Sequence, residues 1–402
     1  MRKGVLYITY DGVLEPLGQS QVIRYLELLS VDHKVFLISF EKADDWKAAE
    51  NKRTLIPNIK NSNIHWTPLR YHKHPSAIAT AFDILQGIII GTWICLRYQI
   101  LIVHARSYVS SVMALFLKKI FGLKFIFDMR GFWADERIDG GIWLKKNKIY
   151  DVAKWFERRF LLSADCVVSL THAAVVEMTK FPYLQGESTK FEVITTCADL
   201  NLFKFKERIS KKEQKHTAFT LGYVGSVGVW YLFDETLKCF KELQKQIPSA
   251  RLHILNRGDH DYIYKQLSTF RISTDSVQIE SASHEGVVKA MNNMDAGIFL
   301  IKPVYSKLAS APTKLGEFLG CGVPCLGNAM VGDMEAILRD EHVGVILNSF
   351  NEISIKKAIT KLITLTHEND IKVRCRNVAL HHFSLTKGVK KYDEIYQELY
   401  ET

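Results

Sequence analysis

The chain has 402 residues, which is longer than one ordinary hydrophobic core accommodates. Of these residues 47% are hydrophobic and 24% charged, a composition that excludes a disordered protein. We therefore expect a folded protein with two domains of about 200 residues each. Lysine and arginine outnumber aspartate and glutamate by 53 to 43, which gives a net charge of +10. This surplus suits an anionic ligand, an acidic membrane surface or nucleic acid, and does not choose among them.

Cysteine content and hydropathy narrow the class further. The seven cysteines include no CxxC pair, which favours free thiols in a reducing compartment over disulfides or a zinc site. The first apolar run ends at Asp11, too early for a signal peptide. In the most apolar segment, residues 84–101, Gln86 and Arg97 leave ten uninterrupted residues, whereas a membrane span needs about 20. We expect no transmembrane helix.

The first half of the chain alternates short apolar runs with helical segments. The predicted strands are residues 5–10, 35–40, 100–104, 125–128 and 166–170. The first is followed by the loop DGVLEPLG and a helix from about Gln19. Such alternation predicts a parallel sheet covered on both faces by helices. Ligands bind beyond the carboxyl ends of such strands, so the residues that follow each strand are the candidates for function.

Two of these strand ends carry charged and aromatic side chains. Arg106 and Tyr108 follow the strand 100–104. The strand 125–128 ends at Asp128 and is followed by the segment MRGFWADER, which contains Arg130, Trp133, Asp135 and Glu136. We expect these side chains to converge at one edge of the sheet. Either they bind a ligand, or the carboxylates pair with the arginines and simply fix the loops.

The chain changes character at residues 197–216, a charge-rich run with little periodicity, which predicts a linker. The strand-loop-helix pattern then restarts with strand 219–224, the sequence GSVG and a helix from about Tyr231. Gly225 and Gly228 let the backbone approach a ligand closely, although a GxxG pattern alone is a weak signal. Further strands are predicted at residues 252–255, 277–281, 297–301, 323–326 and 344–347.

The segment SKLASAPTKLGEFLGCGVPCLGN, residues 306–328, joins a loop, a helix start and a strand. Pro312 suits the first helical position, and the helix is predicted to run to Gly322. Thr313 and Glu317 would then lie on one face, about 6 Å apart along the axis, a diphosphate-to-ribose distance. The helix N-terminus, with Thr313 and Lys314, would bind the anion, and Glu317 would accept a vicinal diol. A solvated surface helix explains the same residues equally well.

Cations follow several strands of the second half, namely Arg257, Lys302, Lys307 and Lys314. All are expected at one edge of the sheet, where they would offset the charge of a leaving diphosphate without a metal ion. The rival interpretation is that Asp259 and Asp261 form a DxD metal site. Because Arg257 would repel a metal and Asp261 suits a helix N-cap, we favour the cap.

Taken together, the sequence resembles the GT-B glycosyltransferases of the large retaining family 4. The resemblance covers nearly the whole chain through YDGVLEPLGQSQV, VHARSY, FDMRGFWADER, YVGSVG and, most specifically, SAPTKLGEFLGCGVPCLGN. It implies an α/β protein of two Rossmann-like domains that face each other across a cleft. The expected parts are an acceptor domain at 1–197, a nucleotide-sugar donor domain at 198–384, and a helix at 385–402 that crosses back to the first domain.

The function implied is transfer of a sugar from a nucleoside-diphosphate sugar to a glycan or lipid-linked acceptor, with retention and without metal or cofactor. The expected setting is synthesis of bacterial surface polysaccharides, in the cytoplasm or peripherally on the inner face of the plasma membrane, with no nucleic-acid partner. Residues 78–148, which mix tryptophans and phenylalanines with lysines and arginines, would suit an anionic leaflet, although most of these aromatics are equally suited to a core.

Site residues carry over by their positions in the motifs. The expected donor-binding residues are Gly18, Gly225, Ser226, Arg257, Lys307, Pro312, Thr313, Lys314 and Glu317. The expected catalytic residues are Asp128, Arg130 and Asp135. The expected acceptor-binding residues are Arg106, Tyr108, Trp133 and Glu136. Within the donor set, Glu317 matches the glutamate that holds the ribose, and the backbone at Gly225 and Thr313 matches positions that meet the phosphates.

The sequence also departs from the family pattern. Ala309 replaces an acidic residue thought to contact the donor sugar, Ser226 stands where a cation is usual, and Arg130 replaces the usual histidine. We expect Arg257, Lys307 or Lys314 to supply the missing charge. These departures keep two alternatives open: a nucleotide-sugar epimerase with the same fold, and a binding protein without turnover.

Overall fold

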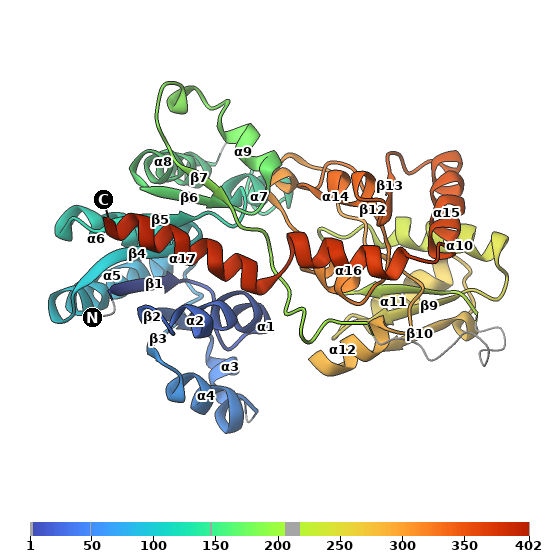
Figure 1. Ribbon diagram of the computed structural model, residues 1–402, viewed down its shortest axis with the longest axis horizontal. Helices are drawn as coiled ribbons and strands as arrows, with labels where there is room; N and C mark the ends of the chain where they lie inside the picture. Colours follow the sequence, from blue (N-terminus) through green and yellow to red (C-terminus); the bar gives the residue numbers. More distant parts are fainter. Residues whose placement is uncertain (1–2, 49, 145–146, 206–217, 402) are drawn as a thin grey trace. The chain divides into compact units, whose positions relative to one another are not determined.

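The computed structural model describes residues 3–48, 50–144, 147–205 and 218–401 (Figure 1). The chain forms two compact units: unit 1 comprises Met1–Thr195 with Leu385–Thr402, and unit 2 comprises Thr196–Ser384. The chain therefore leaves unit 1 two residues before the predicted boundary at 197. The later part of the predicted linker, from residue 206 onward, lies outside the described residues.

Unit 1 contains a seven-stranded parallel sheet in the order β3-β2-β1-β4-β5-β6-β7. The strands are β1 (Gly4–Thr9), β2 (Lys34–Glu41), β3 (Ile64–Arg70), β4 (Ile100–Arg106), β5 (Lys124–Asp128), β6 (Cys166–Ser169) and β7 (Phe191–Val193). The central strands are almost fully buried, as expected for a parallel sheet covered on both faces. The predicted fold class is confirmed for this half.

The sequence analysis missed the two edge strands of this sheet. β3 reads IHWTPLR, in which polar residues alternate with apolar ones and Pro68 removes a backbone donor, a composition tolerated at an edge. β7 has only three residues. In addition, β4 extends two residues beyond the predicted end, so that Arg106 is its last residue and Tyr108 belongs to the following helix.

The helices of unit 1 connect these strands. They are α1 (Pro16–Gly18), α2 (Arg24–Leu29), α3 (Ala43–Lys47), α4 (Ile56–Asn61), α5 (Ser76–Arg97), α6 (Ser107–Phe121), α7 (Trp133–Asp139), α8 (Lys148–Ser163) and α9 (His172–Met178). Since β3, β4, β5 and β6 follow one another across the sheet in one direction, right-handed crossovers place α5, α6 and α8 on the same face. α6 packs between α5 and α8.

Helix α5 is longer than its sequence suggested, because it continues without a break through Gln86. Its segment Ala77–Arg97 has a mean hydropathy of 1.6, and by length and composition alone it is long and apolar enough to cross a membrane. One face of α5 packs closely on unit 1: a Cβ atom at Gly87 or Gly91 would lie within 3 Å of Met113 or Leu117 of α6. The expectation of no transmembrane helix stays a prediction.

The final helix, α17 (Leu385–Glu401), is amphipathic as predicted. It buries Tyr392, Ile395, Tyr396 and Leu399 and packs against α2 and β4, so it completes unit 1 rather than unit 2. The predicted return of the last helix to the N-terminal domain is confirmed.

Unit 2 contains a six-stranded parallel sheet in the order β10-β9-β8-β11-β12-β13. The strands are β8 (Thr220–Val224), β9 (Arg251–Leu255), β10 (Val277–Glu280), β11 (Ala296–Ile298), β12 (Cys325–Asn328) and β13 (Gly344–Leu347). The helices are α10 (Phe233–Gln246), α11 (His260–Thr269), α12 (His284–Met291), α13 (Thr313–Gly320), α14 (Met334–Asp340), α15 (Glu352–Thr366) and α16 (Ile371–His382). The strand order reverses between β8 and β11, and this switch point is where a doubly wound sheet binds its ligand.

Helix α13 is fixed closely against the unit 2 sheet. A Cβ atom at Gly297 of β11 would lie 2.9 Å from the ring of Phe318, so only glycine lets α13 approach this near. Leu315, Phe318 and Leu319 form the buried stripe that was expected. This packing sets the position of Glu317, the neighbour of Phe318.

Candidate active site

The glycine turn of unit 2, residues 225–228, follows the switch-point strand β8. Gly225 and Gly228 have φ angles of +137° and +116°, and a Cβ atom at either would meet nothing within 4 Å. These glycines are therefore needed for their backbone conformation, and the space beside them is open. The Gly225 N–H donates to the Leu255 carbonyl, and Asn256 Nδ2 donates to the Gly225 carbonyl at 2.9 Å. The turn is thus held in place from β9.

The predicted donor residue Ser226 lies in this turn with an exposed side chain. Its carbonyl accepts a 2.6 Å hydrogen bond from the Tyr223 hydroxyl of β8. This bond fixes the backbone of the turn and leaves the serine side chain facing solvent.

Helix α13 begins at Thr313, with Pro312 at the N-cap rather than at the first helical position, and it ends at Gly320 rather than Gly322. The correction is small, because the missing N–H of proline is tolerated at either position. Glu317 is buried, with 5% of its surface exposed, and its Oε2 forms an ion pair with Lys314 Nζ at a distance of 2.7 Å. The alternative of a solvated surface helix is therefore wrong for Glu317.

Tyr231 links the glycine turn to Glu317. Its N–H donates to the Gly228 carbonyl at 2.9 Å, which ties it to the turn. Burial, and next the negative charge of Glu317, raise the pKa of the Tyr231 hydroxyl. The turn, Tyr231 and the carboxylate of α13 therefore belong to one local arrangement in unit 2.

The predicted cations occupy different surroundings. Lys307 is buried, and its Nζ lies 3.7 Å from the centroid of the Trp230 ring, a cation–π contact at the far end of the glycine loop. Lys314 contacts Glu317. Arg257 is exposed and follows Asn256, the residue that holds Gly225. The structure thus brings all three cations to the loops around the switch point, where Ser226 itself carries no charge.

The DxD motif lies at the start of a helix, but the N-cap residue is not the one predicted, and its side chain makes no capping hydrogen bond. Asp259, not Asp261, is the N-cap of α11, and its Oδ2 accepts from Asn256 Nδ2 at 3.2 Å. Asp261 lies in the first turn, which suits the helix dipole. Among the described residues, no group of three or more histidine, cysteine, aspartate or glutamate side chains is arranged to hold a metal ion.

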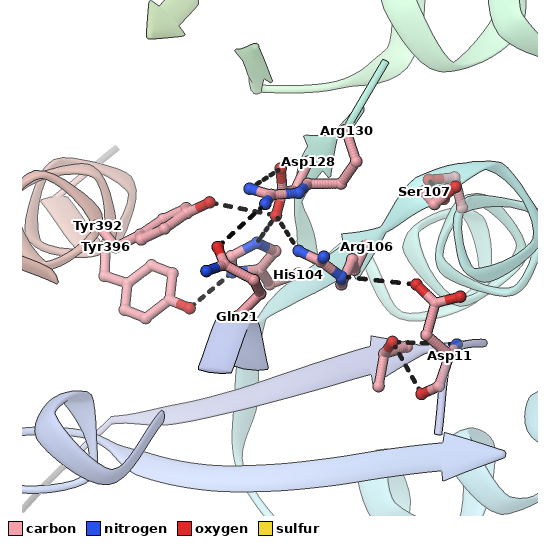
Figure 2. A network of polar contacts seen from close by, with 11 residues as sticks. Asp11, Gln21, His104, Arg106, Ser107, Asp128, Arg130, Tyr392 and Tyr396 are labelled. Atoms are coloured by element: carbon pink, nitrogen blue, oxygen red, sulfur yellow. Dashed lines mark hydrogen bonds and ion pairs between the residues drawn. The ribbon is translucent and has the colours of Figure 1, made fainter. Parts of the chain in front are cut away.

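A second candidate arrangement lies within unit 1, at the carboxyl ends of β1, β4 and β5 (Figure 2). Asp128, the last residue of β5, is 1% exposed. Its carboxylate lies 3.7 Å from Arg130 Nη1, 3.9 Å from Arg106 Nη1 and 3.8 Å from His104 Nε2. The Tyr392 hydroxyl of α17 donates to Asp128 Oδ2 at 3.1 Å. We call Asp128, Arg130, Arg106, His104 and Tyr392 the Asp128 cluster.

In the Asp128 cluster, the two arginines and His104 lie farther from the carboxylate than an ordinary hydrogen bond, whereas the Tyr392 hydroxyl is within hydrogen-bond distance. Burial raises the pKa of Asp128, but Arg130, His104 and Arg106 outweigh it, so the pKa lies below its usual range and the carboxylate stays ionised. Burial lowers the pKa of His104, whose Nδ1 lies 2.7 Å from the hydroxyl oxygen of Tyr396 and shares a hydrogen bond with it. In the part of the chain that is described, Arg106 Nε and Nη1 and Arg130 Nε have no hydrogen-bond partner. The two guanidinium groups thus retain donors for a polar ligand.

The backbone at this edge is also unusual. Ser107 and Arg130 have φ angles of +68° and +59°, a left-handed conformation that residues other than glycine seldom adopt. Each follows the end of a neighbouring strand, β4 or β5. Such conformations gather at functional sites because the surrounding structure must hold them.

Other predicted residues of unit 1 form a separate cluster. Asp135 accepts hydrogen bonds from the Tyr150 hydroxyl at 2.8 Å and from Lys154 Nζ at 3.0 Å. It therefore contacts α8 and does not belong to the Asp128 cluster. The buried Tyr108 donates to Glu157, also on α8, and its ring lies 5.5 Å from that of Trp133. Glu136 is half-buried on α7. The expectation that all these side chains converge in one group is wrong.

Gly18 is required by the local packing of unit 1. A Cβ atom there would lie 2.2 Å from the Gly12 carbonyl oxygen. The buried Glu41 accepts from the Val13 and Leu14 amides and so fixes the loop before Gly18. This explains the glycine without a ligand, and its assignment to the donor stays a prediction.

Sequence reasoning missed His104, Gln21, Tyr392 and Tyr396. His104 was interpreted as part of a strand, and the two tyrosines as apolar positions of an amphipathic helix. Gln21 Oε1 accepts a 3.4 Å hydrogen bond from Arg130 Nη2. The motifs VHARSY and YDGVLEPLGQSQV contain His104 and Gln21, so the signal was present, but no local pattern connects α17 with β5.

Comparisons with known proteins bear on this geometry. Residues 205–377 match the sequence profile of the family described as glycosyl transferases group 1. The second unit is a glycosyl transferases group 1 domain. The resemblance drawn from the sequence motifs is thereby confirmed. A search of curated proteins by sequence finds no match.

Solved structures agree with this group 1 assignment at the level of the fold. Sucrose-phosphate synthase from Thermosynechococcus elongatus is 13% identical, with a TM-score of 0.73 and full coverage of both chains. HepE from Anabaena in complex with UDP is 14% identical, with a TM-score of 0.70, covering 99% of this chain and 100% of that one. WaaG, a glycosyltransferase involved in lipopolysaccharide biosynthesis, is 14% identical, with a TM-score of 0.65, covering 97% and 99%. The chain has the GT-B fold.

Proposed function

We propose that this protein transfers a sugar from a nucleoside-diphosphate sugar to a glycan or lipid-linked acceptor, in the synthesis of bacterial surface polysaccharide. The observation that supports this most directly lies in the group 1 domain. There the open glycine turn bonds to the Tyr231 amide, and the hydroxyl of Tyr231 is within electrostatic range of the buried Glu317. A nucleotide sugar needs a backbone cradle for its diphosphate and a carboxylate for its ribose, and this arrangement offers both.

In the proposed complex, the turn at 225–228 and the first residues of α13 receive the diphosphate. Lys314 contacts Oε2 of Glu317. We assign the other oxygen, Oε1, to a ribose hydroxyl. Lys307 is buried against Trp230, so its charge is weakly screened and stabilises the departing diphosphate. HepE, which has the same fold, has been crystallised with UDP and with UDP-glucose, which supports a nucleotide-sugar donor.

We assign the acceptor to unit 1, where Arg106 and Arg130 carry N–H groups that make no hydrogen bond among the described residues. Their ion pairs to Asp128 and Asp11 are long, at 3.7 to 3.9 Å. The bond between the anomeric carbon and the diphosphate oxygen breaks, and the acceptor oxygen bonds to the same face of that carbon. The acceptor proton passes to the leaving diphosphate oxygen, so no strong protein base is needed and configuration is retained. We propose that this chemistry uses no metal ion or cofactor, with Lys307, Lys314 and Arg257 as the source of positive charge.

The proposed setting is cytoplasmic, where nucleotide sugars are made. The seven cysteines, all among the described residues, are free, which suits a reducing compartment. WaaG, with a similar fold, acts in lipopolysaccharide biosynthesis, which supports an acceptor destined for the cell surface.

Incubation with a panel of nucleotide sugars and a lipid or glycan extract tests this proposal. Transfer predicts nucleoside-diphosphate release that depends on the acceptor and a product that carries the sugar. Isomerised donor would instead identify an epimerase, and binding in calorimetry without either product would identify a binding protein. Glu317→Gln, with Glu335→Gln on the neighbouring helix α14 as its exposed control, should weaken donor binding only at the first position.

A further inference from the structure

Helix α5 exposes most of its large apolar side chains, whereas a helix that only covers a sheet would bury them against that sheet. Its inner face carries Ala79, Asp83, Gly87, Gly91 and Ile94, four of which are small residues or a carboxylate. Its outer face carries Ile78, Phe82, Leu85, Ile89, Trp93 and Leu96, all between 53% and 74% exposed. A surface helix normally buries its large residues and exposes polar ones. Here the order is reversed.

The spacing of the exposed side chains makes them one continuous surface. Successive members are three or four residues apart, so they lie along a single stripe of the helix, about 27 Å long over 18 residues. The inner glycines explain how this face stays outward, because they let α5 approach Met113 and Leu117 of α6 too closely for larger residues.

The neighbouring helices of the same layer extend this surface. α6 exposes Phe116 and Ile120, and α8 exposes Ile149, Val152 and Trp155. α6 lies between α5 and α8 (Figure 1), and we call the exposed apolar side chains of these three helices the α5–α6–α8 face. Contiguous apolar surface of this kind marks a contact with a membrane or another molecule.

The charges on the α5–α6–α8 face have one predominant sign. The exposed cations on the three helices are Arg97, Lys119, Lys148, Arg158 and Arg159, whereas Asp151 is the one exposed carboxylate among their described side chains. The remaining acidic residues of these helices, Asp83 and Glu157, are buried. Large apolar side chains surrounded by lysine and arginine are complementary to the acyl chains and negative head groups of an anionic lipid bilayer.

A second copy of this chain fits the α5–α6–α8 face less well than a lipid bilayer does. A two-fold dimer would place the α5–α6–α8 face against itself, so cations would oppose cations with one carboxylate each to offset them. A bilayer has no such conflict. We infer that the α5–α6–α8 face docks unit 1 on an anionic lipid surface, with α5 lying in the interface and its stripe from Ile78 to Leu96 inserted. This inference is independent of the proposed transfer, since lipid binding here needs neither donor nor acceptor.

Flotation of the purified full-length protein with lipid vesicles tests the inference. Vesicles of phosphatidylcholine with 30 mol% phosphatidylglycerol should carry the protein upward, and pure phosphatidylcholine vesicles should carry at least ten-fold less. The tryptophan emission should shift to shorter wavelength on binding, because Trp93 and Trp155 leave water. Raising NaCl from 0.1 to 0.5 M should release much of the protein, since the charge component is screened. Equal binding to both vesicle types, or none, overturns the inference.

Two variants and their controls localise the contact. The triple variant Phe82→Ser, Ile89→Ser, Trp93→Ser should bind anionic vesicles at least ten-fold less, with an unchanged thermal midpoint because all three side chains are exposed. The matched control Ile353→Ser, Val373→Ser, Leu380→Ser removes three exposed apolar residues from unit 2 and should bind like the parent. Lys119→Glu, Lys148→Glu should weaken binding and its salt dependence, whereas Lys356→Glu, Lys361→Glu, with the same charge change in unit 2, should not.

Three results contradict the inference. Undiminished binding by the triple variant would remove α5 from the contact. A dimer in light scattering that only the triple variant dissociates, without vesicle binding, would assign the face to a second copy. Protein that stays with vesicles through 0.5 M NaCl and alkaline carbonate washing would mean that α5 spans the bilayer. Nucleotide release is measured separately, so loss of that activity would refute the proposed transfer and leave the lipid contact standing.

Discussion

The two candidate arrangements, one in each unit, are built in contrasting ways. In unit 2 the glycine turn and Glu317 are held by short contacts, among them Tyr223 to Ser226 at 2.6 Å and Lys314 to Glu317 at 2.7 Å. In unit 1 the arginine nitrogens lie 3.7 to 3.9 Å from Asp128, and three arginine N–H groups make no hydrogen bond within the described part of the chain. A preorganised cradle suits a ligand that is the same in every turnover, whereas spare donors suit a partner that must still arrive. The contrast is what the proposed division between donor and acceptor requires.

The largest effect is expected at Arg130. Arg130→Ala removes a guanidinium beside Asp128 that we assign to the acceptor site, and turnover should fall by about 100-fold to 1,000-fold, as for loss of one preorganised electrostatic donor. Donor affinity, measured by calorimetry, should change less than two-fold because Arg130 belongs to unit 1. Arg137→Ala, on the following helix α7 and over the ring of Trp133, is the control. A normal rate in the Arg130 variant would exclude its catalytic role.

Glu317 should show the opposite pattern. Glu317→Ala removes a charged acceptor for the ribose and should weaken donor binding by about 1.5 to 3 kcal/mol. Glu335→Ala, on the exposed face of α14, provides the comparison. Calorimetry with the nucleoside diphosphate alone gives the answer, and unchanged affinity would remove Glu317 from the donor site.

A substitution at Gly225 tests whether donor binding depends on the positive φ angle of this residue. Gly225→Ala places a Cβ at a φ of +137°, where space is open but the conformation is unfavourable, so the expected cost is about 1 to 3 kcal/mol. Donor affinity and the thermal midpoint should both fall. Gly258→Ala, at a glycine of unit 2 that also has open space but no positive φ, should have little effect on either. Equal behaviour of the two variants would contradict the conformational argument.

A substitution at Tyr392 measures how much the hydrogen bond between α17 and Asp128 contributes to stability and turnover. Tyr392→Phe removes a hydrogen bond to an ionised carboxylate and should lower the free energy of unfolding by about 1.5 to 3 kcal/mol, with turnover reduced and donor affinity unchanged. Tyr264→Phe, at a half-exposed tyrosine of unit 2, controls for the hydroxyl itself. A stable variant with full turnover would show that the bond is dispensable.

The smallest effect concerns pH. Burial lowers the pKa of His104 in the folded chain, so below about pH 6.5 the unfolded chain binds a proton that the folded chain does not. Stability should therefore decline as the pH falls from 7 to 5. In His104→Asn, whose amide oxygen can still accept from Tyr396, the decline in thermal midpoint should be shallower. Identical slopes would mean that His104 does not contribute.

The same contrast explains what the sequence could reveal. In unit 2 each part of the arrangement is a local motif: the glycine turn directly follows β8, and Pro312 and Glu317 lie at the start of one helix. Both parts could therefore be predicted from the sequence, apart from the shift of Pro312 to the N-cap. In unit 1, Tyr392 meets Asp128 across 264 positions of sequence, and no local period records such a contact. Asp135 was expected near Asp128, but its partners Lys154 and Tyr150 come from a helix whose packing against α7 no local pattern records. Its catalytic role stays a prediction. The edge strands β3 and β7 were not predicted, because a strand at the edge of a sheet does not need a continuous apolar sequence.

Helix α17 has a consequence for how the chain is made. Unit 2 is contiguous in sequence, so it can fold while the ribosome is still working. Unit 1 begins first and yet lacks Tyr392 and Tyr396 until the final 17-residue helix has emerged. Until then His104 and Asp128 lack the hydroxyl groups of Tyr396 and Tyr392, and a chain cut short at residue 384 would never gain these contacts.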